Sequence, residues 1–318
     1  FSFSKRSSPI MPRAQSLNHT RGSSTLRGIM PGVSNSSALP MSIHCLLRVI
    51  PGLSPVFALA FLASLLINSG WFQYSVDYRI GTRYMDEHIV DNFKREAMKV
   101  PFLAGLLKSD SIYIRSNITF DNLSPLSTYL GKPGNPALGG ITFAEYKRRQ
   151  NQHRDAEIRS LLDVPGFIER AHEIYGYRHF ICDSGGSLCE VVNPDDPNDP
   201  VLKSLSESTL LLNIEGNPQH TRTLVERFRK YPKPMYYQPA FLERIWAEYK
   251  ERKKIRTNDD VVPDDFAVWG FEQLLHHRIP LYQKIAENFG YQIPMEEVPS
   301  IKSENDFLDL LGAVIDRR

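Results

Sequence analysis

The sequence of 318 residues contains no G-x-x-x-x-G-K-[ST] string, the phosphate-binding loop found in many proteins that bind nucleotides. It also contains only three cysteines, Cys45, Cys182 and Cys189, which are too few for a disulfide framework. Cys182 and Cys189 have no histidine or further cysteine at the spacing of zinc ligands, so we expect no zinc site. Reduced thiols of this kind are typical of a cytoplasmic protein.

Acidic residues are absent from the first 76 residues, which contain six lysines and arginines. Because the whole chain has a formal net charge of +2, residues 77–318 carry a net charge of −4. The net positive charge therefore comes from the first 76 residues. The mildly acidic remainder gives no reason to expect a nucleic-acid partner.

Residues 1–50 are rich in serine, proline, glycine and arginine, as in a disordered segment or a targeting arm. An uncharged stretch, residues 49–76, overlaps their end. Its densest part, Val56–Ile67, has twelve apolar or small residues. This part is shorter than the roughly 20 residues of a membrane-spanning helix, although the whole stretch reaches that length.

Three interpretations of residues 1–76 stay open. The stretch 49–76 could anchor the chain in the inner membrane, with the N-terminus in the cytoplasm because basic residues precede it. It could instead be a helix buried in the domain, although Pro51 and Pro55 at its start disfavour this. We favour a third interpretation, a non-native arm, because the composition changes abruptly at Asp77 and the first residue is not methionine.

From Asp77 to the end of the chain, strand patterns and helix patterns alternate, which predicts one α/β domain over residues 77–318. We expect a mostly parallel sheet with helices on both faces and a helical C-terminal part. The expected strands are Ser111–Ile118, Tyr177–Cys182, Thr209–Ile214 and Lys233–Tyr237. The expected helices are Asp86–Lys108 with a break at Pro101, Thr142–Leu162, Pro165–Tyr175, Gln219–Tyr231, Phe241–Arg256, Pro263–His277, Leu281–Phe289 and Asp306–Ile315, with a loop at Asp121–Gly140. Thr142, with Glu145 three residues later, is expected to cap the second of these helices.

The main candidate site follows the strand at 177–182. Asp183 stands where this strand ends, and the turn Ser184-Gly185-Gly186-Ser187 comes next. Ligands of open α/β sheets bind beyond the strand ends, an aspartate there can hold hydrated Mg²⁺, and backbone N–H groups of a glycine-rich turn can contact an anion. We therefore expect catalytic roles for Asp183 and Ser184, and cofactor contacts from Gly185, Gly186 and Ser187. Alternatively, Asp183 only caps the next helix, and the glycines only allow a tight turn.

Arginines of two other segments are weaker candidates. Arg148, Arg149 and Arg154 belong to the helix at 142–162 and could reach over phosphates, because guanidinium groups match phosphate oxygens. The alternative is a solvated helix face, since acidic residues are interspersed with them. Asp77, together with Arg79 and Arg83, could line the same cleft or simply carry surface charge.

Several segments resemble a family of alphaproteobacterial ATPase-like proteins of the P-loop NTPase type. These segments are DYRIGTRYMDEH (77–88), EAMKVPFL (96–103), SDSIYIRSNITFDNLSPLSTYLGKPG (109–134), YGYRHFICDSGGSLCE (175–190) and PKPMYYQPAFL (232–242). The resemblance covers about three quarters of the chain and implies a P-loop fold that binds ATP and Mg²⁺. It places Asp183 at the Walker B-like position. The expected phosphate-binding loop would precede Asp77, where this chain has the acid-free arm instead.

The sequence thus predicts an ATP-binding protein, an ATPase or phosphoryl-transfer protein of unknown substrate, with Mg²⁺ at Asp183. The alternative is a non-catalytic interaction or regulatory protein on a degenerate nucleotide-binding fold. Residues 49–76 could tether this protein to the membrane. A third interpretation is a small-molecule kinase in which the helix at 142–162 acts as a lid. We expect a cytoplasmic location, or inner-membrane association in the tethered case.

Overall fold

The structure, a computed structural model, describes residues 43–49, 55–215 and 218–317. The chain divides between Ser37 and Ala38, and all described residues belong to the second unit, Ala38–Arg318. The expectations for residues 1–42 and for Pro51 lie outside the described residues.

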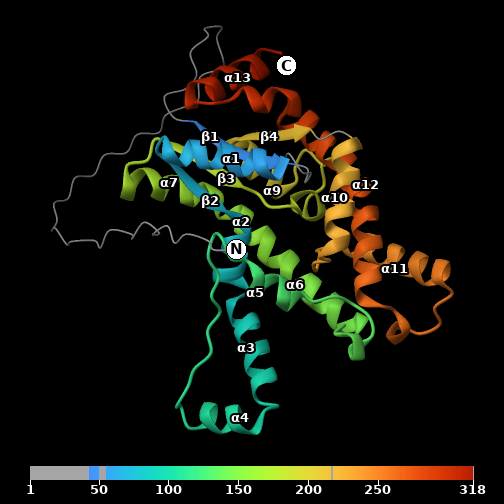
Figure 1. Ribbon diagram of the computed structural model, residues 1–318. Helices are drawn as coiled ribbons and strands as arrows, with labels where there is room; N and C mark the ends of the chain where they lie inside the picture. Colours follow the sequence, from blue (N-terminus) through green and yellow to red (C-terminus); the bar gives the residue numbers. More distant parts are fainter. Residues whose placement is uncertain (1–42, 50–54, 216–217, 318) are drawn as a thin grey trace, which may run out of the picture. The chain divides into compact units, whose positions relative to one another are not determined.

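One sheet of five parallel strands, in the order β2-β3-β1-β4-β5, forms the centre of this unit (Figure 1). The expected α/β class with a parallel sheet is confirmed. The expected strands at 177–182 and 209–214 are β3 and β4, shifted by one or two residues. The strands are β1 (His44–Val49), β2 (Trp71–Ser75), β3 (His179–Asp183), β4 (Leu210–Glu215) and β5 (Tyr291–Pro294).

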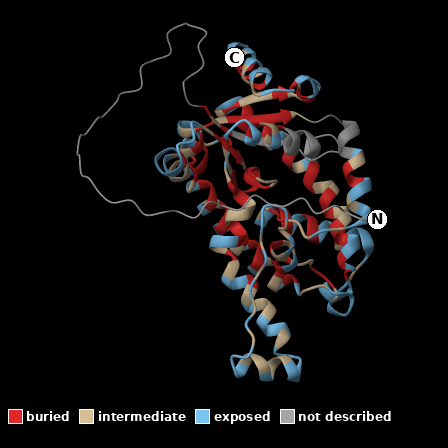
Figure 2. Ribbon diagram, turned by 60° about the vertical axis from the view of Figure 1, so that its left-hand side comes forward, coloured by how far each residue is buried: buried red, intermediate tan, exposed pale blue. Residues whose placement is uncertain are grey.

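The two faces of the sheet are covered by different helices, as the direction of the crossovers requires. The connection from β1 to β2 runs one way across the sheet, whereas the connection from β3 to β4 runs the other way. Right-handed crossovers in opposite directions lie on opposite faces. Accordingly, α1 (Pro55–Asn68) and α13 (Glu304–Asp316) pack on the face that carries Ile181, whereas α6, α7, α9 and α12 pack on the face that carries Phe180 and Cys182 (Figures 1 and 2).

The remaining helices surround this framework. The confirmed Thr142 cap starts α6, because the Thr142 hydroxyl accepts a hydrogen bond from the Glu145 N–H at 3.3 Å. The α-helices not yet bounded are α2 (Val76–Arg79), α3 (Asp86–Ala97), α4 (Pro101–Lys108), α5 (Ser124–Leu130), α6 (Phe143–Leu162), α7 (Val164–Tyr175), α8 (Leu188–Val191), α9 (Pro200–Ser208), α10 (Pro218–Lys230), α11 (Pro239–Lys253) and α12 (Pro263–Phe289).

The domain boundary expected at Asp77 is not where the structure divides the chain. β1 pairs with both β3 and β4, so residues 44–49 lie in the middle of the sheet. Residues 55–68 form α1, whose Leu62 and Leu66 are buried against the sheet. The buried-helix interpretation that Pro55 seemed to disfavour is therefore correct for this part, because proline is tolerated in the first turn of a helix.

Two expected strands are absent from the described sheet. Residues 111–118 have no strand partner among the described residues, so the period-two pattern is present without a sheet to join. Residues 233–237 are also unpaired as a strand. Instead their backbone bonds to side chains, since the Met235 carbonyl accepts from Tyr146 and Gln150 and the Tyr237 N–H donates to Gln150.

Two other expectations concern prolines. The break at Pro101 is confirmed, because α3 ends at Ala97 and α4 begins at Pro101. The break expected before Leu281 is wrong, because α12 runs through Pro280 as a single helix of 27 residues. The burial of Arg278 and Tyr282 on either side of this proline supports the continuous helix. The expected loop 121–140 also contains α5 and a 3₁₀ turn at Pro136–Leu138.

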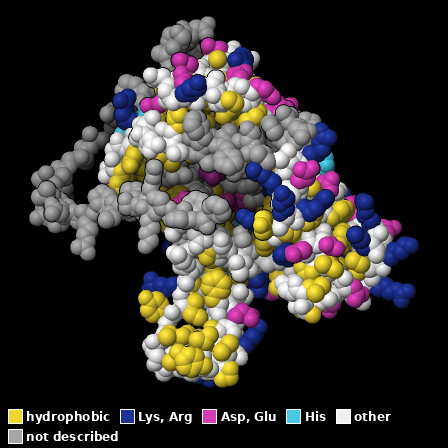
Figure 3. Space-filling view, viewed as in Figure 1, with side chains coloured by type: hydrophobic (Ala, Val, Ile, Leu, Met, Phe, Trp, Pro, Cys, Tyr) yellow, Lys and Arg dark blue, Asp and Glu magenta, His cyan; other side chains and the backbone are white. Residues whose placement is uncertain are grey.

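We call α3, α4 and residues 109–118 the arm. In Figure 1 the arm projects from the sheet, with α4 at its end and residues 109–118 returning alongside α3. No residue of α4 is buried, and Phe102 is 73% exposed. Hydrophobic side chains gather over the end of the arm (Figure 3). The arm therefore exposes apolar surface that the rest of the described chain does not cover.

Another interpretation of residues 49–76 was a membrane anchor. Within residues 43–49, 55–215 and 218–317, none of the helices has the length and apolar composition needed to cross a bilayer.

Gly290 provides a test of the packing between the end of α12 and the sheet. A Cβ atom at this position would lie 2.3 Å from the Leu211 carbonyl oxygen, whereas a Cβ at Gly312 in α13 would have no atom within 4 Å. We expect Gly290→Ala to lower the free energy of unfolding by about 1–3 kcal/mol, because the backbone of β4 must move. The control Gly312→Ala should leave it unchanged or raise it by up to about 1 kcal/mol. Urea denaturation measures both, and equal stabilities of the two variants would contradict this packing.

Candidate functional site

The carboxyl ends of neighbouring strands bring two aspartates to one edge of the sheet. Asp183, the last residue of β3, is in register with Ser75 of β2 and Leu47 of β1. The Ser75 hydroxyl accepts a hydrogen bond from the Tyr78 N–H at 3.3 Å, so α2 begins directly after β2. This cap places Asp77 in the first turn of α2, next to the end of β3.

Gly185 lies against both aspartates. Its N–H donates to Asp183 Oδ1 at 3.0 Å, and its φ of +70° favours glycine. A Cβ atom at this position would lie 2.8 Å from Asp77 Oδ1. The expected tight turn is therefore confirmed. The same contacts also show that Asp77 reaches the turn, as the sequence suggested.

Two carboxylates beside a turn can hold a hard cation. Within the described residues there is no group of three or more histidine, cysteine, aspartate or glutamate side chains that could hold a metal. Mg²⁺ does not need such a cage, because it keeps several waters and binds through one or two carboxylates plus the phosphates of a substrate. Asp77 and Asp183 therefore fit Mg²⁺ bound with a phosphate ligand better than a metal held by protein alone.

The two serines of the turn are buried. Ser184 is fully buried and Ser187 is 6% exposed. The Ser187 hydroxyl donates to Glu157 Oε1 of α6 at 2.8 Å, so this side chain links the turn to the helix. The structure thus places the Ser187 hydroxyl in an internal contact, whereas Gly185 and Gly186 are partly exposed.

A buried arginine of α12 holds the other side of the turn. Arg278 donates from Nη1 to the Gly186 carbonyl at 2.5 Å and from Nη2 to the Tyr236 carbonyl at 2.9 Å. Its Nε donates to Glu190 Oε1 at 3.0 Å, and Glu190 Oε2 accepts from the Gln238 N–H at 2.7 Å. One ion pair therefore connects the turn, α8, α12 and the segment before α11.

The opposite charges of Arg278 and Glu190 stabilise each other. Burial opposes the charge of Arg278, but the Glu190 carboxylate keeps the pKa of Arg278 above its ordinary value. Tyr282, one turn further along α12, donates to the Gly186 carbonyl at 3.4 Å and accepts from the Cys189 N–H at 3.2 Å. The backbone on both sides of Ser187 is thus fixed by side chains of a single helix.

A buried histidine lies close to this network. Burial lowers the pKa of His153 to about 4, and the positive charge of Arg278 acts in the same direction. The His153 Nδ1 lies 3.6 Å from Glu157 Oε2, but burial outweighs this neighbour, so the ring is neutral at neutral pH. The His153 ring stacks on Tyr236, with ring centroids 5.0 Å apart. It therefore acts as a packed aromatic side chain beside the carbonyl that Arg278 contacts.

The three candidate arginines of α6 differ in their contacts and in their position relative to the turn. Arg149 is buried and donates to Glu145 Oε1 at 2.7 Å and to the Tyr129 carbonyl, while Arg148 also pairs with Glu145. The structure does not bring these two arginines to the turn. Arg154 is 42% exposed and stands three residues before Glu157, so it lies on the helix face that contacts Ser187. Of the three, Arg154 is best placed to approach the turn.

The two arginines near Asp77 differ as well. Arg79 forms an ion pair with Asp163 at 2.7 Å and lies over the Phe167 ring, so it is used in packing α2 on α7. Arg83 is exposed. Only Asp77 of this group is placed against the turn.

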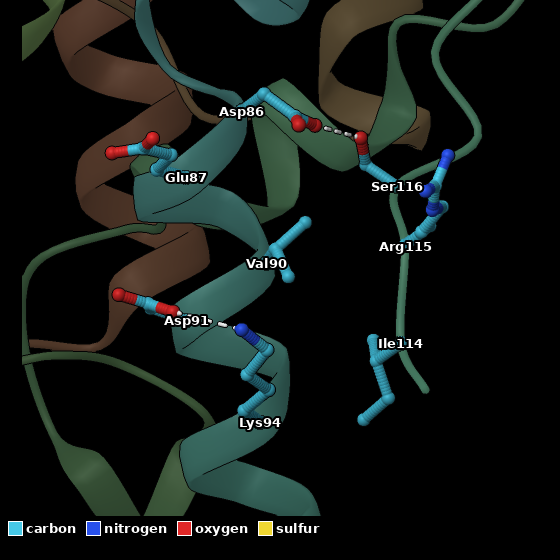
Figure 4. Close-up of a pocket in the computed structure, with 8 residues that line it drawn as sticks. All are labelled: Asp86, Glu87, Val90, Asp91, Lys94, Ile114, Arg115 and Ser116. Carbon is cyan, nitrogen blue, oxygen red and sulfur yellow. Dashed lines mark hydrogen bonds and ion pairs between the residues drawn. The ribbon is translucent and has the colours of Figure 1, made fainter. Parts of the chain in front are cut away.

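Two open hollows are present on this part of the chain. One, of about 620 Å³, lies along the arm between α3 and residues 114–116 (Figure 4). The other, of about 570 Å³, is lined partly by Phe120, Lys132 and Lys233. The Phe120 ring stacks on Tyr78 with centroids 4.5 Å apart, and Tyr78 is the neighbour of Asp77. One residue that lines the second hollow thus contacts the chain neighbour of Asp77.

Sequence reasoning missed Glu190 and Arg278. His277, which directly precedes Arg278, is half-buried and stacks on Phe241, with ring centroids 4.1 Å apart. A signal was present, since both missed residues are charged residues within apolar runs, LCEVV and LLHHRIPLY. Charged residues buried in this way usually pair, but the partner of each could not be read from the sequence.

We expect Arg278→Met and Glu190→Gln each to lower the free energy of unfolding by about 3–5 kcal/mol, because each leaves a partner buried without its counter-charge. Combining both should cost less than the sum of the single changes. The control is Lys284→Met on the same helix, which removes an exposed pair with Asp195 and should cost less than about 1 kcal/mol. Urea denaturation measures all four variants. Additive effects of the two buried changes would rule out the pair as a unit.

Comparison with known proteins adds no further constraint, because no protein-family model, curated protein or solved structure matches this chain.

Proposed function

We propose that this chain binds the phosphates of a nucleotide, together with Mg²⁺, at the edge formed by Asp77, Asp183 and Gly185. The observation that carries the proposal is the register of the sheet, which aligns the carboxyl ends of β1, β2 and β3 with two aspartates beside them. Small ligands of open α/β sheets bind outside the carboxyl ends of the strands, where the strand order reverses.

The strand order reverses at β1. Its connection crosses to β2, while both its neighbours, β3 and β4, continue toward the opposite edge. The connections therefore leave on opposite faces and open a crevice beside β1. Asp183 is in register with Leu47 of β1, so it stands at this crevice.

Each residue of the turn has a role in the proposed complex. Asp183 and Asp77 would hold Mg²⁺ directly or through its waters, and Mg²⁺ would neutralise the charge of the phosphates. Gly185 and Gly186, which are partly exposed and have no side chains, would let a phosphate oxygen come close to the turn, and Ser184 would keep the turn in place from its buried position. Arg154 is the side chain of α6 that could add positive charge.

A P-loop-like nucleotide-binding fold remains part of the proposal. The parallel sheet and the acid at the end of β3 support the resemblance in the segments around Asp183. The missing G-x-x-x-x-G-K-[ST] string removes the lysine and hydroxyl that usually position the phosphates. We therefore propose binding of Mg-ATP with slow or no hydrolysis, since most rate enhancement depends on such positioned groups.

A small-molecule kinase is the second candidate, because one specific observation favours it. The hollow beside Tyr78 contains Lys132 and Lys233 as well as the hydroxyls of Ser124, Ser127 and Thr128. Lys132 pairs with Asp264, and Lys233 is exposed. A polar hollow lined by two lysines suits an anionic acceptor, and ATP turnover that needs an added acceptor would distinguish this candidate.

The proposal is tested by Asp183→Asn in the full chain. The asparagine Oδ1 can still accept from the Gly185 N–H, so the turn keeps its hydrogen bond while the negative charge is lost. We expect the Kd for Mg-ATP, measured by calorimetry, to rise at least tenfold, or about 1.4 kcal/mol. Removing Mg²⁺ with EDTA should weaken wild-type binding and have little further effect on the variant.

The matched control is Asp309→Asn. Asp309 is an exposed aspartate of α13, which packs on the face of the sheet that carries Ile181. It should leave the Kd unchanged. If wild type and Asp183→Asn bind Mg-ATP equally, or if wild-type binding is independent of Mg²⁺, the assignment of Asp183 is wrong.

A further inference from the structure

Residues 111–118 of the arm have the pattern of a β-strand. Apolar or small residues alternate with polar or aromatic ones, and the exposure alternates in the same way. Ile112, Ile114, Ser116 and Ile118 are half-buried, whereas the residues between them are exposed, with Tyr113 at 81%. A period of two in both sequence and exposure is typical of a strand with one covered face.

The backbone of this segment has almost no partner within the chain. Among the described residues, no backbone N–H of residues 112–118 donates a hydrogen bond, and of their carbonyls only that of Asn117 accepts one, from Asn122. The segment is held to the rest of the chain by side chains, among them the Ser116 hydroxyl, which contacts Asp86 (Figure 4), and Ile118, which packs against the core. An extended edge with open N–H and C=O groups is a template for another strand.

The end of the arm adds apolar surface beside this edge. The N–H of Ser111 donates to the Leu106 carbonyl at 3.0 Å, so the segment begins directly against α4. Met98, Val100 and Phe102 are exposed to 42%, 46% and 73%. A strand that pairs with residues 111–118 would therefore also bring its own flanking residues near an apolar helix.

We propose that residues 111–118 pair antiparallel with the same residues of a second copy of this chain, about a two-fold axis at Ile114. In this register Tyr113 lies opposite Arg115 of the second copy, and Arg115 lies opposite its Tyr113. Within one chain the Arg115 guanidinium carbon already lies 5.5 Å from the centroid of the Tyr113 ring. The pairing therefore places a cation beside an aromatic ring twice, once for each copy.

Two other kinds of register are less favourable. An axis at Arg115 would place two arginines directly opposite each other, and like charges in opposed positions destabilise a sheet. An axis between two residues would oppose the exposed face of one copy to the half-buried face of the other, which the period-two pattern disfavours. The register about Ile114 thus pairs Tyr113 with Arg115 twice, and this self-complementarity points to a second copy as the partner.

Space for the second copy is available. In Figures 1 and 2 the arm projects from the sheet, so residues 109–118 can be approached without displacing the other helices. The apolar residues of α4 would then be covered by the partner arm. This proposal is independent of nucleotide binding, because the arm lies outside the turn at residues 183–187.

A cysteine at the axis tests the proposed register. In Ile114→Cys the two thiols of a dimer would be opposed, with Cα atoms about 4.5–5.5 Å apart, within the range of a disulfide. We expect a mild oxidant to convert this variant of the full chain to a covalent dimer of twice 36.4 kDa on a non-reducing gel. The native Cys45, Cys182 and Cys189 are buried and should not react. Asp155→Cys, at an exposed position of α6, is the control and should remain largely monomeric.

Proline substitutions test the backbone pairing. Successive residues of an antiparallel strand alternate in donating to the partner, so either Ile114→Pro or Arg115→Pro removes a cross-strand hydrogen bond. At least one of them should raise the dimer dissociation constant tenfold or more in light scattering. Both should keep the wild-type Tm of the monomer, because neither N–H is bonded within the chain.

Three results would overturn the proposal. One is a mass of 36.4 kDa at every soluble concentration together with no cross-linking of Ile114→Cys. Another is a dimer that neither proline weakens. The third is a monomer that sediments with phosphatidylserine vesicles through Phe102, which would assign the end of the arm to a lipid surface.

Discussion

The buried pair of Arg278 and Glu190 is the interaction on which the candidate site depends. It joins residues 88 positions apart in the chain and lets one guanidinium contact both the Gly186 and the Tyr236 carbonyls. Removing two charges from water is unfavourable, and such a pair is stable only when every polar atom finds a partner. Here Glu190 has the Gln238 N–H on its other oxygen, so this requirement is met. The turn after β3 is consequently held by fixed side chains and not by its own backbone alone.

This fixed turn gives the sheet edge its chemical character. With the Gly186 carbonyl bonded to Arg278 and the Ser187 hydroxyl bonded to Glu157, both groups are directed into the protein. Gly185 is left against Asp77 and Asp183, where its positive φ allows a closer approach than another residue could make. Two carboxylates and a short stretch of accessible backbone are therefore presented together. This arrangement suits a metal ion that brings its own phosphate ligands, and it suits a protein-only metal cage poorly.

Local patterns in the sequence predicted the features that depend on neighbouring residues. The apolar runs of β3 and β4, the cap at Thr142 and the turn after Asp183 all belong to this class. The edge strands β2 and β5 and the strand β1 were not predicted, because each owes its stability to the strands beside it. Arg278 and Glu190 were missed for the same reason, since their meaning depends on a contact between distant segments. Residues 233–237 have a strand composition, but side chains of α6 and Arg278 satisfy their backbone before any strand can.

The arm shows the opposite disagreement, a strand pattern that the fold leaves without a sheet. In most proteins the choice of residues at each position agrees with the global structure, and a local pattern that conflicts with it usually has a functional cause. Residues 111–118 keep the alternation of a strand although no described residue pairs with them, and α4 keeps an apolar composition although none of its residues is buried in the described part of the chain. Both features lie on one projecting element, and both are explained by a single contact with another molecule. A random loss of structure would leave neither the period of two nor the complementarity of Tyr113 and Arg115, so the pattern is best understood as the half of an interface that one chain contributes.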